Sequence, residues 1–203
     1  MKQNRSSTKT VRMVQLAVLS AVIIVLQLLS YSILKIGEIS ISLVLVPVVA
    51  GAFALGPASG AFLGFVFGAV TLVGCISGVD IGGNILLVAN PVLTSFLCIA
   101  KGTLCGWLPG LLYRALRKRS HAYWTDLVCA ALCPVVNTGV FLTITLLFYR
   151  DILTAWAGGT ALLTYVIVGL VGINFLVELC LNVFIAPPVS RAMNKLIASG
   201  RVR

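Results

Sequence analysis

Four polar side chains lie within long apolar stretches of the sequence, where they could hold a ligand. Lys101 falls inside one apolar run, about ten residues or roughly 15 Å of helix from its start. Two later runs contain Asn137, Asn174 and Glu178. An ammonium group binds a carboxylate or a phosphate, and an amide both donates and accepts hydrogen bonds. A charge in hydrocarbon costs at least about 2.5–3.5 kcal/mol, so each charged group needs a partner or water.

Two arrangements of these side chains are compatible with the sequence. In the first, Lys101, Asn137 and Asn174 line the outer part of a ligand cavity. In the second, Lys101 forms an ion pair with Glu178, and asparagine bridges hold the helices together. Asn174, Glu178 and Asn182 follow at four-residue spacing, which places them on one face of a helix. Because Glu178 and Asn182 lie nearer the inner end of their run, a structural role is favoured for these two.

A polar segment over residues 74–90, GCISGVDIGGNILLVAN, is expected to be an external loop, with a short apolar stretch at 85–88 that dips into the membrane. This loop and the start of the next run add four candidates. Polarity is usual in a loop, and Asn90 followed by proline is also typical of a helix start. The complete set of substrate-binding candidates is Lys101, Asn137, Asn174, Asn84, Asn90, Asp80 and Thr94.

The sequence carries no motif for catalysis, ATP binding or metal binding. GxxxxGK[ST], GxSxG and HExxH do not occur, and the single histidine, His121, lies in a basic segment. The six cysteines form no CxxC pair, and Cys75 has no evident partner in the expected loop. We therefore expect neither an enzyme nor a protein with a metal or other cofactor.

The elements that must position these residues are membrane-spanning helices. The chain is 60% hydrophobic and 10% charged, with a mean hydropathy of +1.09, whereas soluble domains are about 25% charged. A helix needs about 20 apolar residues to cross the hydrocarbon core. The sequence predicts an all-α integral membrane protein, a single domain over 1–203 with about six spans. The spans are about 11–30, 39–55, 58–73, 91–112, 126–149 and 161–186, the last ended by Pro187 and Pro188.

The basic residues give these spans a direction. Twelve of the fifteen lysines and arginines fall in the segments on one side, two on the other, and Lys101 lies within a span. Because cytoplasmic segments of membrane proteins are enriched in lysine and arginine, we expect both termini in the cytoplasm. The net charge of +10 therefore reflects membrane topology and does not indicate a nucleic-acid partner.

Small residues recur at four-residue spacing on three of the expected helices. Glycines at 60, 64 and 68 share one face, as do glycines at 102, 106 and 110. Ala17 and Ala21 form a similar but weaker pair on the first span. Small residues let helix backbones approach closely in lipid, where hydrophobic burial gives helices no reason to associate. We expect the two glycine rows to pack within the bundle.

Several segments together resemble the substrate-specific (S) component of an energy-coupling factor (ECF) transporter. The resemblance covers nearly the whole chain in helix number, length and orientation. The segments that carry it are QLAVLSAVIIVLQ, GAFALGPASGAFLGFVFG, NPVLTSFLCIAKGTLCGWLPG, PVVNTGVFLT and GLVGINFLVELCLN.

The resemblance implies a function and partners. S components capture a vitamin or related micronutrient at the outer face of a prokaryotic plasma membrane. They dock on a transmembrane coupling protein and two ATPases, and are expected to topple in the membrane to release the substrate. Docking in the family uses an AxxxA-type pattern on the first helix, which Ala17 and Ala21 match. The family's ligand region, in the outer loops and the outer parts of the last three helices, favours Lys101, Asn137 and Asn174.

Two other classes of function are also compatible with the sequence. A stand-alone facilitator or channel would move a small solute without partners or ATP. An intramembrane enzyme would depend on Glu178 or a cysteine. For an S component, the buried lysine favours a ligand with a carboxylate or phosphate, such as pantothenate or folate, over thiamine.

Overall fold

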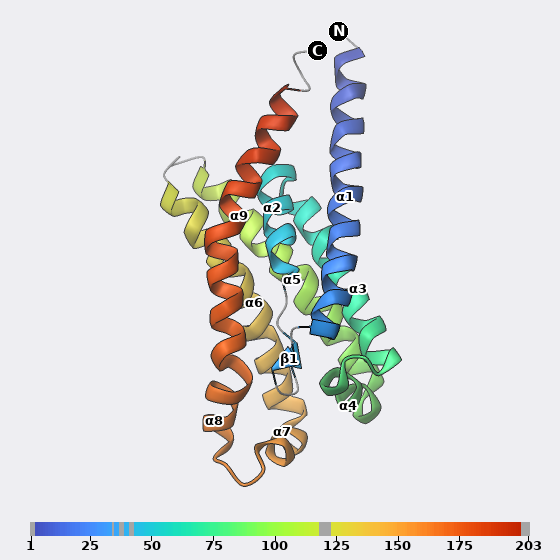
Figure 1. Cartoon of the computed structure of the whole chain (residues 1–203), viewed down its shortest axis with the longest axis vertical. Coiled ribbons are helices and arrows are strands. Elements are labelled where there is room, and N and C mark those ends of the chain that lie inside the picture. The colour runs from blue at the N-terminus through green and yellow to red at the C-terminus, as the bar shows by residue number, and fades with distance from the viewer. Residues whose placement is uncertain (1–2, 34, 37–38, 41–42, 118–122, 200–203) are drawn as a thin grey trace.

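A bundle of long helices forms the protein in the computed structural model, which describes residues 3–33, 35–36, 39–40, 43–117 and 123–199 (Figure 1). The apolar stretches of the sequence form most of these helices, because a helix satisfies all of its backbone hydrogen bonds internally. The elements in chain order are α1 (Gln3–Ile33), β1 (Lys35–Ile36), β2 (Ile39–Ser40), α2 (Leu45–Leu55), α3 (Pro57–Ser77), α4 (Ile81–Ala89), α5 (Pro91–Arg117), α6 (Tyr123–Phe148), α7 (Arg150–Ala157), α8 (Leu162–Thr164), a π-helical segment (Tyr165–Gly172) and α9 (Ile173–Ser199).

The two ends of the bundle are formed by different elements. The start of α1 and the end of α9 lie together at the top of Figure 1, and we call this the terminal end. The short helices α4 and α7 lie at the bottom, which we call the α4–α7 end. Five of the cations assigned from the sequence to the cytoplasmic side lie outside the described residues: Lys2, Lys118, Arg119, Arg201 and Arg203. His121 also lies outside the described residues.

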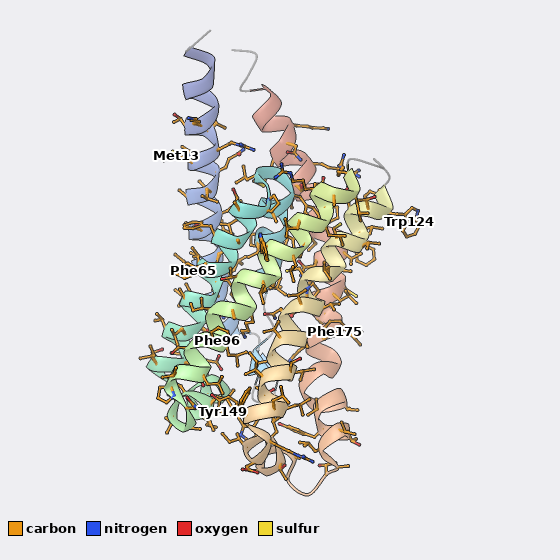
Figure 2. All side chains as sticks on the ribbon, turned by 180° about the vertical axis from the view of Figure 1, so that it is seen from behind. Met13, Phe65, Phe96, Trp124, Tyr149 and Phe175 are labelled. Atoms are coloured by element: carbon orange, nitrogen blue, oxygen red, sulfur yellow. The ribbon has the colours of Figure 1, made fainter. Side chains whose placement is uncertain are left out.

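Within the described residues, five helices are long and apolar enough to cross a membrane: α1, α3, α5, α6 and α9. Helix α2 is apolar but has only 11 residues, about 16 Å at 1.5 Å per residue. Large apolar side chains project outward, including Met13, Phe96 and Trp124 at 71%, 62% and 75% exposure (Figure 2). An apolar exterior of this extent is suited to lipid. The prediction of an all-α membrane bundle is confirmed.

Two of the expected boundaries differ from the structure near the α4–α7 end. The expected second span began at residue 39, but Ile39–Ser40 pairs antiparallel with Lys35–Ile36, and helix α2 begins only at Leu45. The expected loop over 74–90 contains the last turn of α3 and all of α4. Helix α4 forms because Asp80 accepts a hydrogen bond from Gly83 N at 3.1 Å, which caps its N-terminus.

The last helix continues through the two prolines that were expected to stop it. Helix α9 extends to Ser199 with Pro187 and Pro188 inside it. Two neighbours of these prolines, Ala186 and Ser190, are buried at 0% and 2% exposure. Packing of this segment against the bundle therefore compensates for the backbone hydrogen bonds that the prolines remove.

An ion-pair cluster at the terminal end joins three helices. Asp126 of α6 is 2% exposed, and Arg191 of α9 donates to its Oδ2 from Nη2 at 2.6 Å and from Nε at 3.2 Å. Arg117 Nη2 of α5 lies 3.5 Å from Asp126 Oδ1. A buried carboxylate needs such compensation, so this cluster fixes the terminal ends of α5, α6 and α9 relative to one another.

Helices α3 and α5 form the most extensive helix pair in the bundle. A Cβ atom added to Gly60 would overlap Gly106 O, and one added to Gly64 would overlap Gly102 O. The backbones therefore touch directly along a seam, which we call the glycine seam and define by Gly60, Gly64, Gly102 and Gly106. The two glycine rows pack inside the bundle, as the sequence predicted.

Candidate functional site

A cavity of about 110 Å³ lies among helices α1, α3, α4, α5, α6, α7 and α9. It lies towards the α4–α7 end, since its wall includes residues of α4 and α7. Both polar and aromatic side chains face it. The lining residues are Gln27, Phe67, Thr71, Cys75, Asp80, Gly82, Gly83, Leu86, Thr94, Leu97, Cys98, Lys101, Asn137, Thr138, Phe141, Trp156, Asn174, Phe175 and Glu178.

Lys101 projects from α5 into this cavity between two aromatic rings. Its Nζ lies 5.4 Å from the ring centroid of Phe141 and 6.0 Å from that of Phe67. Contact with the face of an aromatic ring stabilises a cation within about 6 Å. The rings therefore help to hold a charged lysine at this depth, with its ammonium group facing the cavity where an anionic group of a ligand can reach it.

Three buried amides form part of the polar wall. Gln27, Asn137 and Asn174 are 3%, 9% and 6% exposed and come from α1, α6 and α9. Their side-chain oxygens are fully buried and have no hydrogen-bond partner among the described residues. A buried acceptor left without a partner costs about 1–3 kcal/mol. A ligand with N–H or O–H donors would offset that cost.

Glu178 and Asn182 take different positions, although the sequence favoured a structural role for both. Glu178 is 6% exposed and lines the same cavity as Lys101. Asn182 is fully buried, does not line the cavity, and donates from Nδ2 to the Glu178 carbonyl oxygen at 2.9 Å. Asn182 therefore keeps the expected structural role, whereas Glu178 adds a carboxylate to the cavity.

The loop candidates divide into two groups. Asp80 and Thr94 line the cavity. Thr94 Oγ1 lies 2.7 Å from the Tyr149 hydroxyl, which in turn donates to the Asn90 carbonyl oxygen at 3.2 Å. These bonds tie the start of α5 to the junction of α6 and α7. Asp80 also caps α4. Asp80 and Thr94 therefore both line the cavity and stabilise the α4–α7 end of the bundle.

Asn84 and Asn90 do not line the cavity. Asn84 donates from Nδ2 to the Cys75 carbonyl oxygen at 2.8 Å, which fastens α4 to α3. Asn90 is exposed, and its side-chain oxygen accepts from Leu93 N at 3.1 Å. This bond is the helix-start cap that the Asn-Pro pair also indicated. Both asparagines have structural contacts in place of a contact with the cavity.

Two cysteines line the cavity although the sequence did not indicate them as part of a ligand site. Cys75, expected in a loop, lies in the last turn of α3 and is 1% exposed. Its Sγ is 4.0 Å from Cys98 Sγ of α5 and 3.8 Å from Asp80 Oδ2. Both thiols line the cavity. Their proximity follows from the close packing of α3 on α5 and could not be inferred from their spacing of 23 residues.

Sequence reasoning also missed part of the wall. Gln27 is a polar residue in an apolar run, which is the signal that identified Asn137, and the same reasoning could have found it. The aromatic residues Phe67, Phe141 and Trp156 gave no comparable signal, because aromatic residues are common throughout membrane helices. Only the folded arrangement shows that they line the same cavity as Lys101.

Comparison with known proteins assigns the chain to a family. A family model described as "ECF transporter, substrate-specific component" matches residues 11–190. The match includes all residues that line the cavity. None of the curated proteins compared with the chain matches it. Because the family model covers most of the sequence, the chain belongs to the substrate-specific components of ECF transporters.

Proposed function

We propose that this chain binds a water-soluble vitamin or related micronutrient in the cavity beside Lys101, for ATP-driven uptake by partner subunits. The main support is one observation: Lys101 lines the same small cavity as three residues whose amide oxygens are buried without partners among the described residues. Such an arrangement is costly for a purely structural interior. It is favourable when a ligand supplies the missing partners.

The lining indicates the kind of ligand. Lys101 suits a carboxylate or phosphate, and the oxygens of Gln27, Asn137 and Asn174 suit donors on the same molecule. Aromatic rings on several sides suit a flat or apolar portion. At about 110 Å³ the cavity is smaller than the roughly 300–1,000 Å³ of pockets for drug-sized ligands. We therefore favour a small anionic ligand, with widening of the cavity for a larger one.

The orientation of the protein is part of the proposal. The lysine and arginine distribution supports a cytoplasmic terminal end, so the cavity lies in the outer half of the membrane. Ala17 and Ala21 are exposed on α1, next to the exposed Val14, Val18 and Val22. This apolar face is compatible with docking on the transmembrane coupling protein.

Replacing Ala17 or Ala21 by tryptophan is expected to block uptake while binding by the isolated protein remains. A bulky side chain would separate α1 from a helix packed against it. Uptake of labelled ligand by cells that express the whole complex would be measured. Val135→Trp provides the control, because Val135 is 47% exposed on α6, away from α1. Unchanged uptake in both alanine variants would contradict the docking proposal.

The dependence on partners is tested with purified protein. Mass spectrometry of small molecules that copurify with the chain would identify a candidate ligand. The chain alone in liposomes is then expected to bind this ligand without accumulating it, and accumulation should require the ATPases and ATP. Rapid ATP-independent flux through the isolated chain would instead support a stand-alone facilitator.

A further inference from the structure

A second concavity, of about 350 Å³, lies at the terminal end between α1, α3, α5 and the end of α2. It is distinct from the cavity beside Lys101, with which it shares no lining residue. We call it the arginine pocket. Its lining residues are Arg12, Ala52, Phe53, Ala54, Gly56, Pro57, Gly110, Tyr113, Arg114 and Arg117.

The arginine pocket has positive charge that the described residues do not neutralise. Three guanidinium groups, those of Arg12, Arg114 and Arg117, line it. Among the described residues, the carboxylate near it belongs to Asp126, which is already paired with Arg191 and Arg117. Neither Arg12 nor Arg114 forms an ion pair within the described part of the chain. An anion from outside the protein would therefore be stabilised here.

One wall of the pocket is held in a fixed geometry. The rings of Phe53 and Tyr113 stack with centroids 4.0 Å apart and planes at 8°. Arg117 Cζ lies 5.2 Å from the Tyr113 ring, and its buried Nε has no hydrogen-bond partner in the described structure. An arginine oriented in this way loses less side-chain entropy when it binds a phosphate oxygen.

The N-terminus of a long helix adds to the positive potential of the pocket. Helix α3 begins at Pro57, and both Gly56 and Pro57 line the pocket, so the positive end of this 21-residue helix faces it. Ala52 and Phe53 also line the pocket but are almost fully buried, at 1% and 6% exposure. The acyl chains of a bound lipid would therefore lie outside the pocket, in the surrounding bilayer.

The pocket lies at the level where lipid headgroups are expected. The apolar span of α1 begins at Lys9, close to Arg12, and the span of α5 ends at Arg117. Its arginines are therefore at the ends of spans, at the boundary between hydrocarbon and water. Basic pockets between helices at this level bind the headgroups of anionic lipids.

We propose that the arginine pocket binds the phosphate of an anionic phospholipid whose acyl chains remain in the surrounding bilayer. The guanidinium groups would bind the phosphate oxygens by charge-assisted hydrogen bonds. This inference does not depend on which substrate occupies the cavity beside Lys101.

Native mass spectrometry of the detergent-purified chain tests the proposal, by titration with phosphatidylglycerol, phosphatidylcholine or water-soluble glycerol phosphate. Phosphatidylglycerol should be retained most strongly. The double substitution Arg12→Gln and Arg114→Gln should weaken its binding about 25-fold, at roughly fivefold for each cation. The matched control is Lys9→Gln with Lys195→Gln, which removes the same charge at the same end from exposed positions outside the pocket. It should change affinity less than about threefold, because neither lysine lines the pocket.

Three results would overturn the proposal. Equal weakening in the two double variants would indicate general surface charge, and equal retention of phosphatidylcholine would exclude recognition of an anionic headgroup. Binding of glycerol phosphate as tight as that of the lipid would indicate a site for a soluble phosphate. Melting temperatures of all variants would be compared. If the double variant does not fold, Arg12→Gln alone would be tested, because Arg12 lies on α1 and Arg114 on α5.

Discussion

Gly64→Leu is expected to prevent the bundle from assembling. Even the first carbon of a side chain at this position would overlap Gly102 O and lie 2.9 Å from Gly102 C. Because these are backbone atoms, they cannot rotate away as a side chain could, and α3 must separate from α5. Overpacking a well-filled interior typically costs about 1–3 kcal/mol, and a whole leucine in a backbone contact should exceed that range. Size-exclusion chromatography and thermal unfolding in detergent would measure the loss of folded protein.

Gly139→Leu is the matched control for this experiment. Gly139 lies within the span of α6, and a Cβ added there would have no neighbour within 4 Å. The same substitution should therefore leave folding nearly unchanged, or stabilise the helix slightly because leucine has the higher helix propensity. A folded Gly64→Leu protein with a wild-type melting temperature would contradict the close approach of α3 and α5.

Lys101→Met should lower the affinity for an anionic ligand by about 10- to 100-fold or more. Methionine keeps much of the length of the side chain but removes the charge, and hydrogen bonds to charged groups contribute about 1.5–3 kcal/mol. Isothermal titration with pantothenate and folate as carboxylate-bearing probes would measure the effect, and thiamine is the cationic comparison. Lys101→Arg should retain much more of the affinity. Unchanged binding of every anionic ligand in Lys101→Met would remove Lys101 from the site.

A double-mutant cycle separates a binding role of Lys101 from a structural pair with Glu178. If Lys101 and Glu178 stabilise each other, each single change, Lys101→Met or Glu178→Gln, should lower the melting temperature of the ligand-free protein. The double variant would then recover part of the loss. A binding role instead predicts nearly unchanged melting temperatures with a large loss of affinity. A structural pair predicts a lower melting temperature and a binding role predicts an unchanged one. The cycle therefore decides between the two arrangements that the sequence left open.

Much of the fold could be predicted because lipid restricts the choices. In hydrocarbon every backbone polar group must be paired internally, so long apolar runs such as those in α3 and α6 could hardly be anything but helices. The exceptions were segments where packing against the rest of the bundle decides. Helix α9 continues through Pro187 and Pro188 because its neighbours are buried, and α2 begins late because residues 39–40 pair with 35–36.

The candidate site was predictable wherever a polar residue stood out against apolar neighbours. Lys101, Asn137 and Asn174 were found for this reason, and all three line the cavity. Asn84 and Asn90 could not be separated from them by sequence, because a capping asparagine and a ligand-binding asparagine have the same side chain. For Asn84 the difference follows only from the fold of α4 against α3, whereas Asn90 makes a local helix-start bond with Leu93 N.

Because the backbones of α3 and α5 touch along the glycine seam, the two helices should move together as one rigid body. Phe67 and Lys101 belong to this rigid body, whereas Asn137 and Asn174 belong to α6 and α9. Any change in the width of the cavity must then come from displacement of the other lining helices, among them α6 and α9. Lys101 would thus hold a bound ligand at a fixed position, and the two asparagines would move when the ligand binds.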